Sequence, residues 1–154
     1  MKDVLVEFYN RDILKLKDEI SKYKDEKILW QTSAAISNSA GNLSLHLVGN
    51  LNHFIGAVLG KTGYKRERDK EFSQKDIPVK MLIDMVEKTR EVVVEALSAL
   101  SENDLVLDFP EKYNDKIQST GFMLQHLLTH LNYHHPASKL LLPVLLQTFV
   151  CAHY

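Results

Sequence analysis

Apolar residues recur every three or four positions in much of the chain, which is the spacing of one face of an α-helix. The first stripe consists of Leu5, Tyr9, Ile13, Leu16, Ile20 and Tyr23. Lys, Asp and Glu fill most of the positions between them, so this segment is predicted to be a long amphipathic helix. A second helix is expected over about 41–59, because the apolar stretch LSLHLVGNLNHFIGAVLG follows several N-cap candidates in SAAISNSAGN.

A third helix is predicted after Asp76, which can cap it. Its first turn tolerates Pro78, because an early helical N–H has no intrahelical partner to lose. The buried stripe of this helix is expected to be Leu82, Val86, Thr89, Val93, Leu97 and Leu100.

A fourth helix is expected over about 120–135, with Ser119 or Thr120 as its cap. Pro136 should end or kink it, because proline has no N–H for the helix and its ring crowds the preceding turn. A last helical segment is predicted over 137–150.

Two polar connections separate these helices, KTGYKRERDKEFSQKD and SENDLVLDFPEKYNDKIQST, and both are read as long loops. Strand signals are nearly absent. The apolar stripes are buried most simply in an all-α four-helix bundle, and loops of this length allow a crossover connection. A chain of 154 residues suits a single domain spanning 1–154.

The charge balance and the single cysteine exclude several classes of protein. The net charge is −1, with 19 basic and 20 acidic residues, so nucleic acid binding is not indicated. One cysteine, Cys151, rules out an intramolecular disulfide and a cysteine-based zinc knuckle, and it is compatible with a reducing cytosol.

No membrane or secretion signal is recognised in the sequence. The N-terminus carries charge throughout, unlike a signal peptide. The most apolar run, 140–152, is shorter than the ~20 residues that span a bilayer. We therefore expect a cytoplasmic protein that forms a homodimer through helix faces such as 140–152.

Four of the seven histidines lie within QHLLTHLNYHH, residues 125–135. Positions i and i+4 of a helix share a face about 5–6 Å apart, so two imidazoles at this spacing can ligate one ion. His126 with His130 and His130 with His134 both have this spacing. The neighbouring apolar residues do not decide which partner of His130 faces the core.

A third ligand is expected from the second helix. His46 lies within the apolar segment LSLHLVG, where an unpaired imidazole is costly to bury, and His53 is a competing candidate seven residues later. Three histidines from two helices leave coordination positions open for water or substrate. The alternative is that the candidate ligands are ordinary core or surface histidines. His135 and His153 are expected to face solvent.

The fragments NLSLHLVGNLNHFIG, GYKRERDKEF and LLTHLNYH resemble the DinB-like metal-binding superfamily, in a subgroup with H-L-x-x-N-x and R-x-R-D-x-E-F patterns. The resemblance covers residues 1 to about 135. It implies a bundle in which one histidine of the second helix and a later H-x-x-x-H pair hold nickel or zinc. By motif position these ligands are His46, His130 and His134. The segment 136–154 is atypical, because relatives continue after the last ligand with one residue and then G-Q.

The charged run KRERDKEF offers a substrate-binding site in Arg66 and Arg68, because arginine binds carboxylates bidentately. The alternative is a solvated run whose ion pairs contribute little. The leading hypothesis is a divalent-metal protein whose ion activates water or a thiol, and the resemblance implies relatives that are thiol-dependent S-transferases or isomerases. The expected activity is that of a metal-dependent thiol transferase or hydrolase acting on a small thiol or electrophile. The second hypothesis is a non-catalytic metal-binding or stress-associated dimeric interaction protein. No catalytic side chain is assigned.

Overall fold

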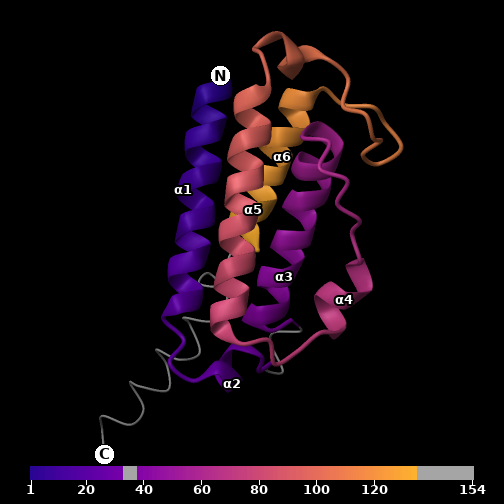
Figure 1. Ribbon diagram of the computed structural model, residues 1–154. Coiled ribbons are helices and arrows are strands. Elements are labelled where there is room, and N and C mark those ends of the chain that lie inside the picture. Colours follow the sequence, from indigo (N-terminus) through magenta and orange to yellow (C-terminus); the bar gives the residue numbers. More distant parts are fainter. Residues whose placement is uncertain (33–37, 135–154) are drawn as a thin grey trace, which may run out of the picture.

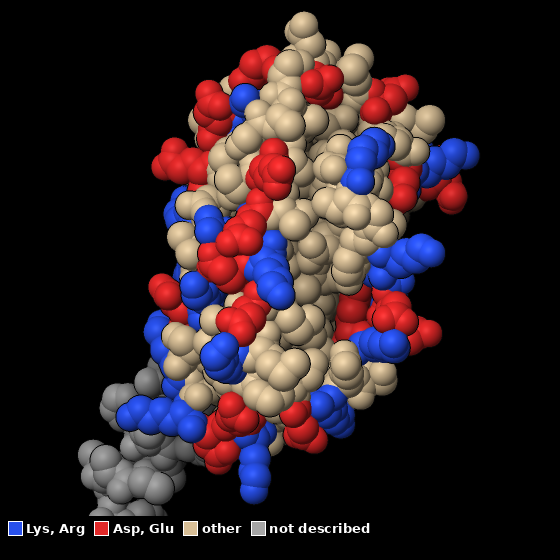
Figure 2. Space-filling view, viewed as in Figure 1, with Lys and Arg blue, Asp and Glu red and all other residues tan. Residues whose placement is uncertain are grey.

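The structure is a computed structural model that describes residues 1–32 and 38–134 (Figure 1). Its helices are α1 (Lys2–Ser21), α2 (Glu26–Leu29), α3 (Ala40–Leu51), the π-helix η1 (Asn52–Leu59), α4 (Arg68–Ser73), α5 (Val79–Ala99), the 3-10 helix η2 (Asn103–Val106) and α6 (Thr120–Tyr133). In these ranges extended pairing is limited to isolated bridges, Asp108 with Ser119 and Tyr113 with Lys116. The prediction of an all-α fold is confirmed. Among the described helices, none combines the length and apolar character needed to cross a membrane. Acidic and basic side chains are interspersed on the face shown in Figure 2.

Four long helical segments lie side by side, namely α1, α3 continued by η1, α5 and α6 (Figure 1). Helix α1 packs against α5 and α6, while α3 packs against α5. Helices α3 and α5 point the same way and the other two point the opposite way (Figure 1). The connection from residue 60 to residue 78 therefore runs back along the bundle, and the predicted crossover is confirmed.

The predicted stripes form the core. Leu5, Tyr9, Ile13, Leu16 and Ile20 of α1 are buried, as are Leu82, Val86, Thr89, Val93 and Leu97 of α5. Tyr23 and Leu100 are half-buried at the ends of their stripes. Every residue of α3 is buried, because the crossover segment covers the face that the other helices leave open. Polar side chains on α3 must therefore find partners inside the protein.

The connection after η1 is not simply a loop, because it contains helix α4. Apolar periodicity did not reveal this helix, since six residues make less than two turns and bury only Glu71. Within α4, the side chain buried against the bundle is thus a carboxylate rather than an apolar stripe.

The expected start of the third helix was wrong. Helix α5 begins at Val79, and its cap residue is Pro78, not Asp76. Proline disfavours a helical conformation for the residue before it, and Asp76 adopts a left-handed φ of 59° in the turn that precedes. The N–H of Val79 instead donates to Oε1 of Glu26 at 3.0 Å.

The second predicted helix changes character at Asn52, where the α-helical turns widen into the π-helix η1. The side-chain amide of Asn52 donates to the carbonyl of Val48 at 2.9 Å and to Oγ1 of Thr89 at 2.7 Å. A side chain that donates to a helical carbonyl competes with the backbone N–H that would normally bond to it. Single π-helical turns are often found at functional sites.

Helix α6 begins as predicted, because Oγ of Ser119 accepts from the N–H of Phe122 at 3.2 Å. The loop before it contains η2 and the two bridges. The predicted segment 137–150, the apolar run 140–152, His135 and His153 lie outside the described residues.

Candidate metal centre

Three histidines come together between α3 and the end of α6. One nitrogen from each of His46, His130 and His134 lies within 4.8 Å of the others. The Nε2 atoms of His46 and His130 are 3.3 Å apart, and the rings of His130 and His134 are 4.5 Å apart between centroids. The pair that faces His46 is therefore His130 with His134, which the helical spacing alone had left open.

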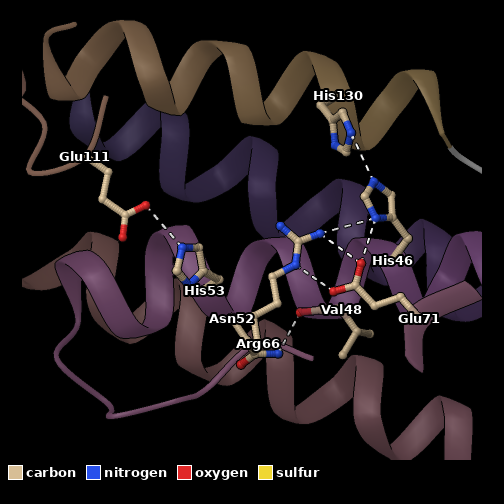
Figure 3. A network of polar contacts seen from close by, with 8 residues as sticks. All are labelled: His46, Val48, Asn52, His53, Arg66, Glu71, Glu111 and His130. Carbon is tan, nitrogen blue, oxygen red and sulfur yellow. Dashed lines mark hydrogen bonds and ion pairs between the residues drawn. The ribbon is translucent and has the colours of Figure 1, made fainter. Parts of the chain in front are cut away.

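The two competing histidines lie elsewhere. His53 shares the helix face of His46, but seven residues advance a helix by about 10 Å, so one ion cannot reach both. Its Nε2 lies 3.1 Å from Oε2 of Glu111 (Figure 3). His126 is outside the cluster and packs against the ring of Tyr113, with centroids 4.5 Å apart.

Glu71 of α4 orients His46. Its Oε2 lies 2.9 Å from Nδ1 of His46, and Arg66 donates to both carboxylate oxygens at 2.6 and 2.8 Å (Figure 3). An ionised carboxylate only accepts hydrogen bonds, so Nδ1 carries the proton. The lone pair of His46 is then on Nε2, which faces His130.

Burial and neighbouring charges set the protonation of this group. Burial disfavours the carboxylate of Glu71, but hydrogen bonds from Arg66 and His46 and their charges outweigh it, and the pKa of Glu71 lies below its ordinary value. Burial also lowers the pKa of His46 despite the nearby Glu71. Burial and then the charges of His134 and His46 lower the pKa of His130 to about 4. Both imidazoles are therefore neutral near pH 7, as metal ligands must be.

The position of Glu71 depends on two residues of α3. The side-chain amide of Asn42 donates to the carbonyls of Glu71 at 3.0 Å and of Gln74 at 2.8 Å, which holds both ends of the last turn of α4. At Gly49, an added Cβ would collide with the carboxylate of Glu71. Glycine is required there for a close approach rather than for a turn.

Sequence reasoning considered Glu71 only as part of a charged substrate clamp and did not predict that it orients His46. The solvated-run interpretation was wrong for Arg66 and Glu71, whose side chains are only 12% and 6% exposed. The solvated-run interpretation is correct for Glu67 and Lys70, which form an exposed ion pair. The one available signal was the R-x-R-D-x-E-F pattern, which does not by itself say which charge is buried.

A cavity of about 460 Å³ adjoins the three histidines, within the usual range of small-molecule sites. Part of its wall is apolar, formed by Leu43, Phe54, Phe72, Met123 and Leu127. Its polar lining consists of the three histidines with Asn38, Asn50, Arg66, Arg68, Tyr113 and His126. Both arginines that the sequence suggested for substrate binding therefore line it, although Arg66 already donates to Glu71.

The residues fit a divalent transition metal. Two imidazole nitrogens on a tetrahedral ion are about 3.3–3.4 Å apart, given metal–nitrogen distances of about 2.0–2.1 Å, and the two Nε2 atoms lie at 3.3 Å. The contact of His46 with Glu71 is the carboxylate–histidine arrangement that commonly supports metal ligands. Nδ1 of His130 is buried and accepts or donates no hydrogen bond within the described ranges. Imidazole ligands suit zinc and nickel.

Comparisons with known proteins agree with this fold. A family model described as "Protein of unknown function (DUF1572)" matches residues 5–135. The chain is similar to a solved structure, that of a DinB-like protein from Bacillus cereus ATCC 10987, with a TM-score of 0.65 and 17% identity. The alignment covers 84% of this chain and 83% of that one, and at this identity it concerns the fold alone. No curated protein matches. Because the family model spans most of its length, the chain belongs to the DUF1572 family, and its helical fold is DinB-like.

Proposed function

We propose that the protein binds one divalent metal ion, nickel or zinc, through His46, His130 and His134. The observation that carries this proposal is the convergence of three imidazoles from two helices, one of them oriented by a carboxylate. An ion can accept the lone pairs of imidazoles that converge in this way, and His46, the buried member of the three, would be costly to bury without a partner.

A bound ion would act as a Lewis acid and lower the pKa of a water or thiol. Three protein ligands leave a position open for that group, which catalytic sites require. The adjoining cavity offers room for a small molecule next to the cluster. We therefore propose a metal-dependent thiol transferase or hydrolase that acts on a small thiol or electrophile.

Metal content tests the ligand assignment. Protein purified without chelator should contain about one divalent ion per chain, and His46→Ala, His130→Ala and His134→Ala should each sharply reduce it. His53→Ala and His126→Ala are matched controls on the same two helical segments and should retain the metal. Normal metal content in the triple replacement of the three proposed ligands would refute the site.

Cobalt substitution separates an enzyme from a closed binding site. An open coordination position should change the visible spectrum when azide or a thiol is added. Activity toward thiol substrates should then fall together with metal loss. An unresponsive spectrum would favour the alternative, a non-catalytic metal-binding or stress-associated interaction protein.

We further propose a cytoplasmic homodimer, as the apolar run 140–152 suggests. Light scattering on the full chain should give twice the monomer mass. A monodisperse monomer would remove this proposal without affecting the metal site.

A further inference from the structure

The lining of the cavity comes in part from α3, continued by η1, and from α6, which run in opposite directions (Figure 1). On the α3 side, Asn50 follows His46 by one turn, and Phe54 follows by another. On α6, His126 precedes His130 by one turn. Since all of these residues line the same cavity, it has a histidine end and, one turn away, a second polar zone next to aromatic and apolar wall.

Asn50, which lines this second zone, has an unpaired hydrogen-bond acceptor. The residue is 7% exposed, and its carbonyl oxygen Oδ1 is buried without a protein partner in the described part of the chain. A buried acceptor left without a donor is unfavourable, because it has lost its hydrogen bonds to water. Because Asn50 lines the cavity, a rotation of its side chain can bring this oxygen to a ligand N–H or O–H.

Arg68 presents an unused cation to the same cavity. Arg66 donates to both oxygens of Glu71, so this pair is neutral overall. Arg68 is exposed and lines the cavity, and its side chain has no hydrogen bond or ion pair with another described residue. A guanidinium binds a carboxylate through two parallel hydrogen bonds, and one uncompensated charge matches a monoanion better than a phosphate.

We propose that the cavity binds a small carboxylic acid with an apolar body and an N–H or O–H donor. Arg68 binds its carboxylate, Asn50 accepts from its donor, and Phe54, Phe72 and Leu127 contact the apolar body. This inference deepens the proposed function and rests on it, because that function makes this cavity the substrate site.

The probe is 6-hydroxyhexanoate, titrated calorimetrically into the protein as purified. Hexanoate lacks the donor, 1,6-hexanediol lacks the carboxylate, and 6-hydroxyhexyl phosphate replaces the carboxylate with a dianion. We expect the hydroxy acid to bind at least tenfold more tightly than each of the three analogues.

Variants locate the binding. Arg68→Met should weaken 6-hydroxyhexanoate binding at least tenfold, and Arg68→Lys should restore part of it. Lys65→Met is the matched control, an exposed cation on the same segment that does not line the cavity, and it should leave binding unchanged. Asn50→Leu should abolish the preference for the hydroxy acid over hexanoate.

The outcomes separate this inference from the metal site. Equal binding by wild type and Arg68→Met, or equal or tighter binding of the diol or the phosphate, overturns the inference. A normal metal content with no binding at the highest soluble probe concentration overturns it too and leaves the metal site standing. Arg68-dependent binding by a protein without metal supports the inference while the proposed metal site fails.

Discussion

Replacing Glu71 with glutamine removes the charge at the centre of the site and keeps the shape of the side chain. In the wild type, both carboxylate oxygens accept from Arg66, and one also accepts from His46. A glutamine amide has one oxygen and one NH₂ group, so its NH₂ group must face an N–H donor of Arg66 or His46. The buried guanidinium of Arg66 also loses its counter-charge.

The expected loss of stability follows from the burial of this pair. With side chains 12% and 6% exposed, solvent screens the pair little. Removing one partner of a buried ion pair costs about 3–5 kcal/mol. We expect about 3 kcal/mol for Glu71→Gln, because Arg66 lines the cavity and can be partly rehydrated there. Loss of the acceptor for His46 should also weaken metal affinity about 10- to 100-fold.

Urea denaturation in the presence of a chelator measures the stability loss without any contribution from metal. Competition with a chromophoric chelator measures metal affinity separately. Asp84→Asn is the matched control, because it breaks an exposed ion pair with Lys80 and should cost less than about 1 kcal/mol. A double variant with Arg66→Met should lose less stability than the two single losses added together. A loss in Glu71→Gln no larger than in the control would refute this account.

Three further measurements test other parts of the fold. Gly49→Ala should cost about 1–3 kcal/mol in urea denaturation, because its methyl group would meet the carboxylate of Glu71. Tyr9→Phe should cost about 1 kcal/mol in the same assay, because the buried hydroxyl donates to the carbonyl of Leu124 at 2.7 Å. Because the folded pKa of Glu71 is lowered, its stabilisation is fully present above the unfolded pKa of about 4.3 and is lost as the pH falls through the folded pKa. The stability difference between wild type and Glu71→Gln, followed against pH, should therefore narrow on acidification.

Periodicity and capping chemistry were enough to predict the bundle. The stripes of α1 and α5 are regular because each faces one continuous core, so sequence spacing reports burial directly. Ser119 was identifiable because a cap acts on its own helix, through the N–H of Phe122. Asp76 failed as a cap because Pro78 and the carboxylate of Glu26 decide where α5 begins.

The candidate site was only partly predictable because its geometry is tertiary. The spacing of His130 and His134 is local, but the choice between His126 and His134 depends on where His46 meets α6. The role of Glu71 could not be seen from the pattern, because a charged residue in a charged run gives no periodic signal of burial. It becomes visible only when α4 packs on α3.

The distance along the chain between the clustered histidines links metal binding to folding. His46 and His130 are 84 residues apart in sequence, so an unfolded chain keeps only the nearby pair of α6 as a weak bidentate ligand. An ion that prefers the folded state shifts the unfolding equilibrium by mass action, by about 2.7 kcal/mol when its free concentration is a hundred times the dissociation constant. The ion would act as a reversible crosslink between α3 and α6, and the melting temperature of the whole bundle would become a measure of metal supply.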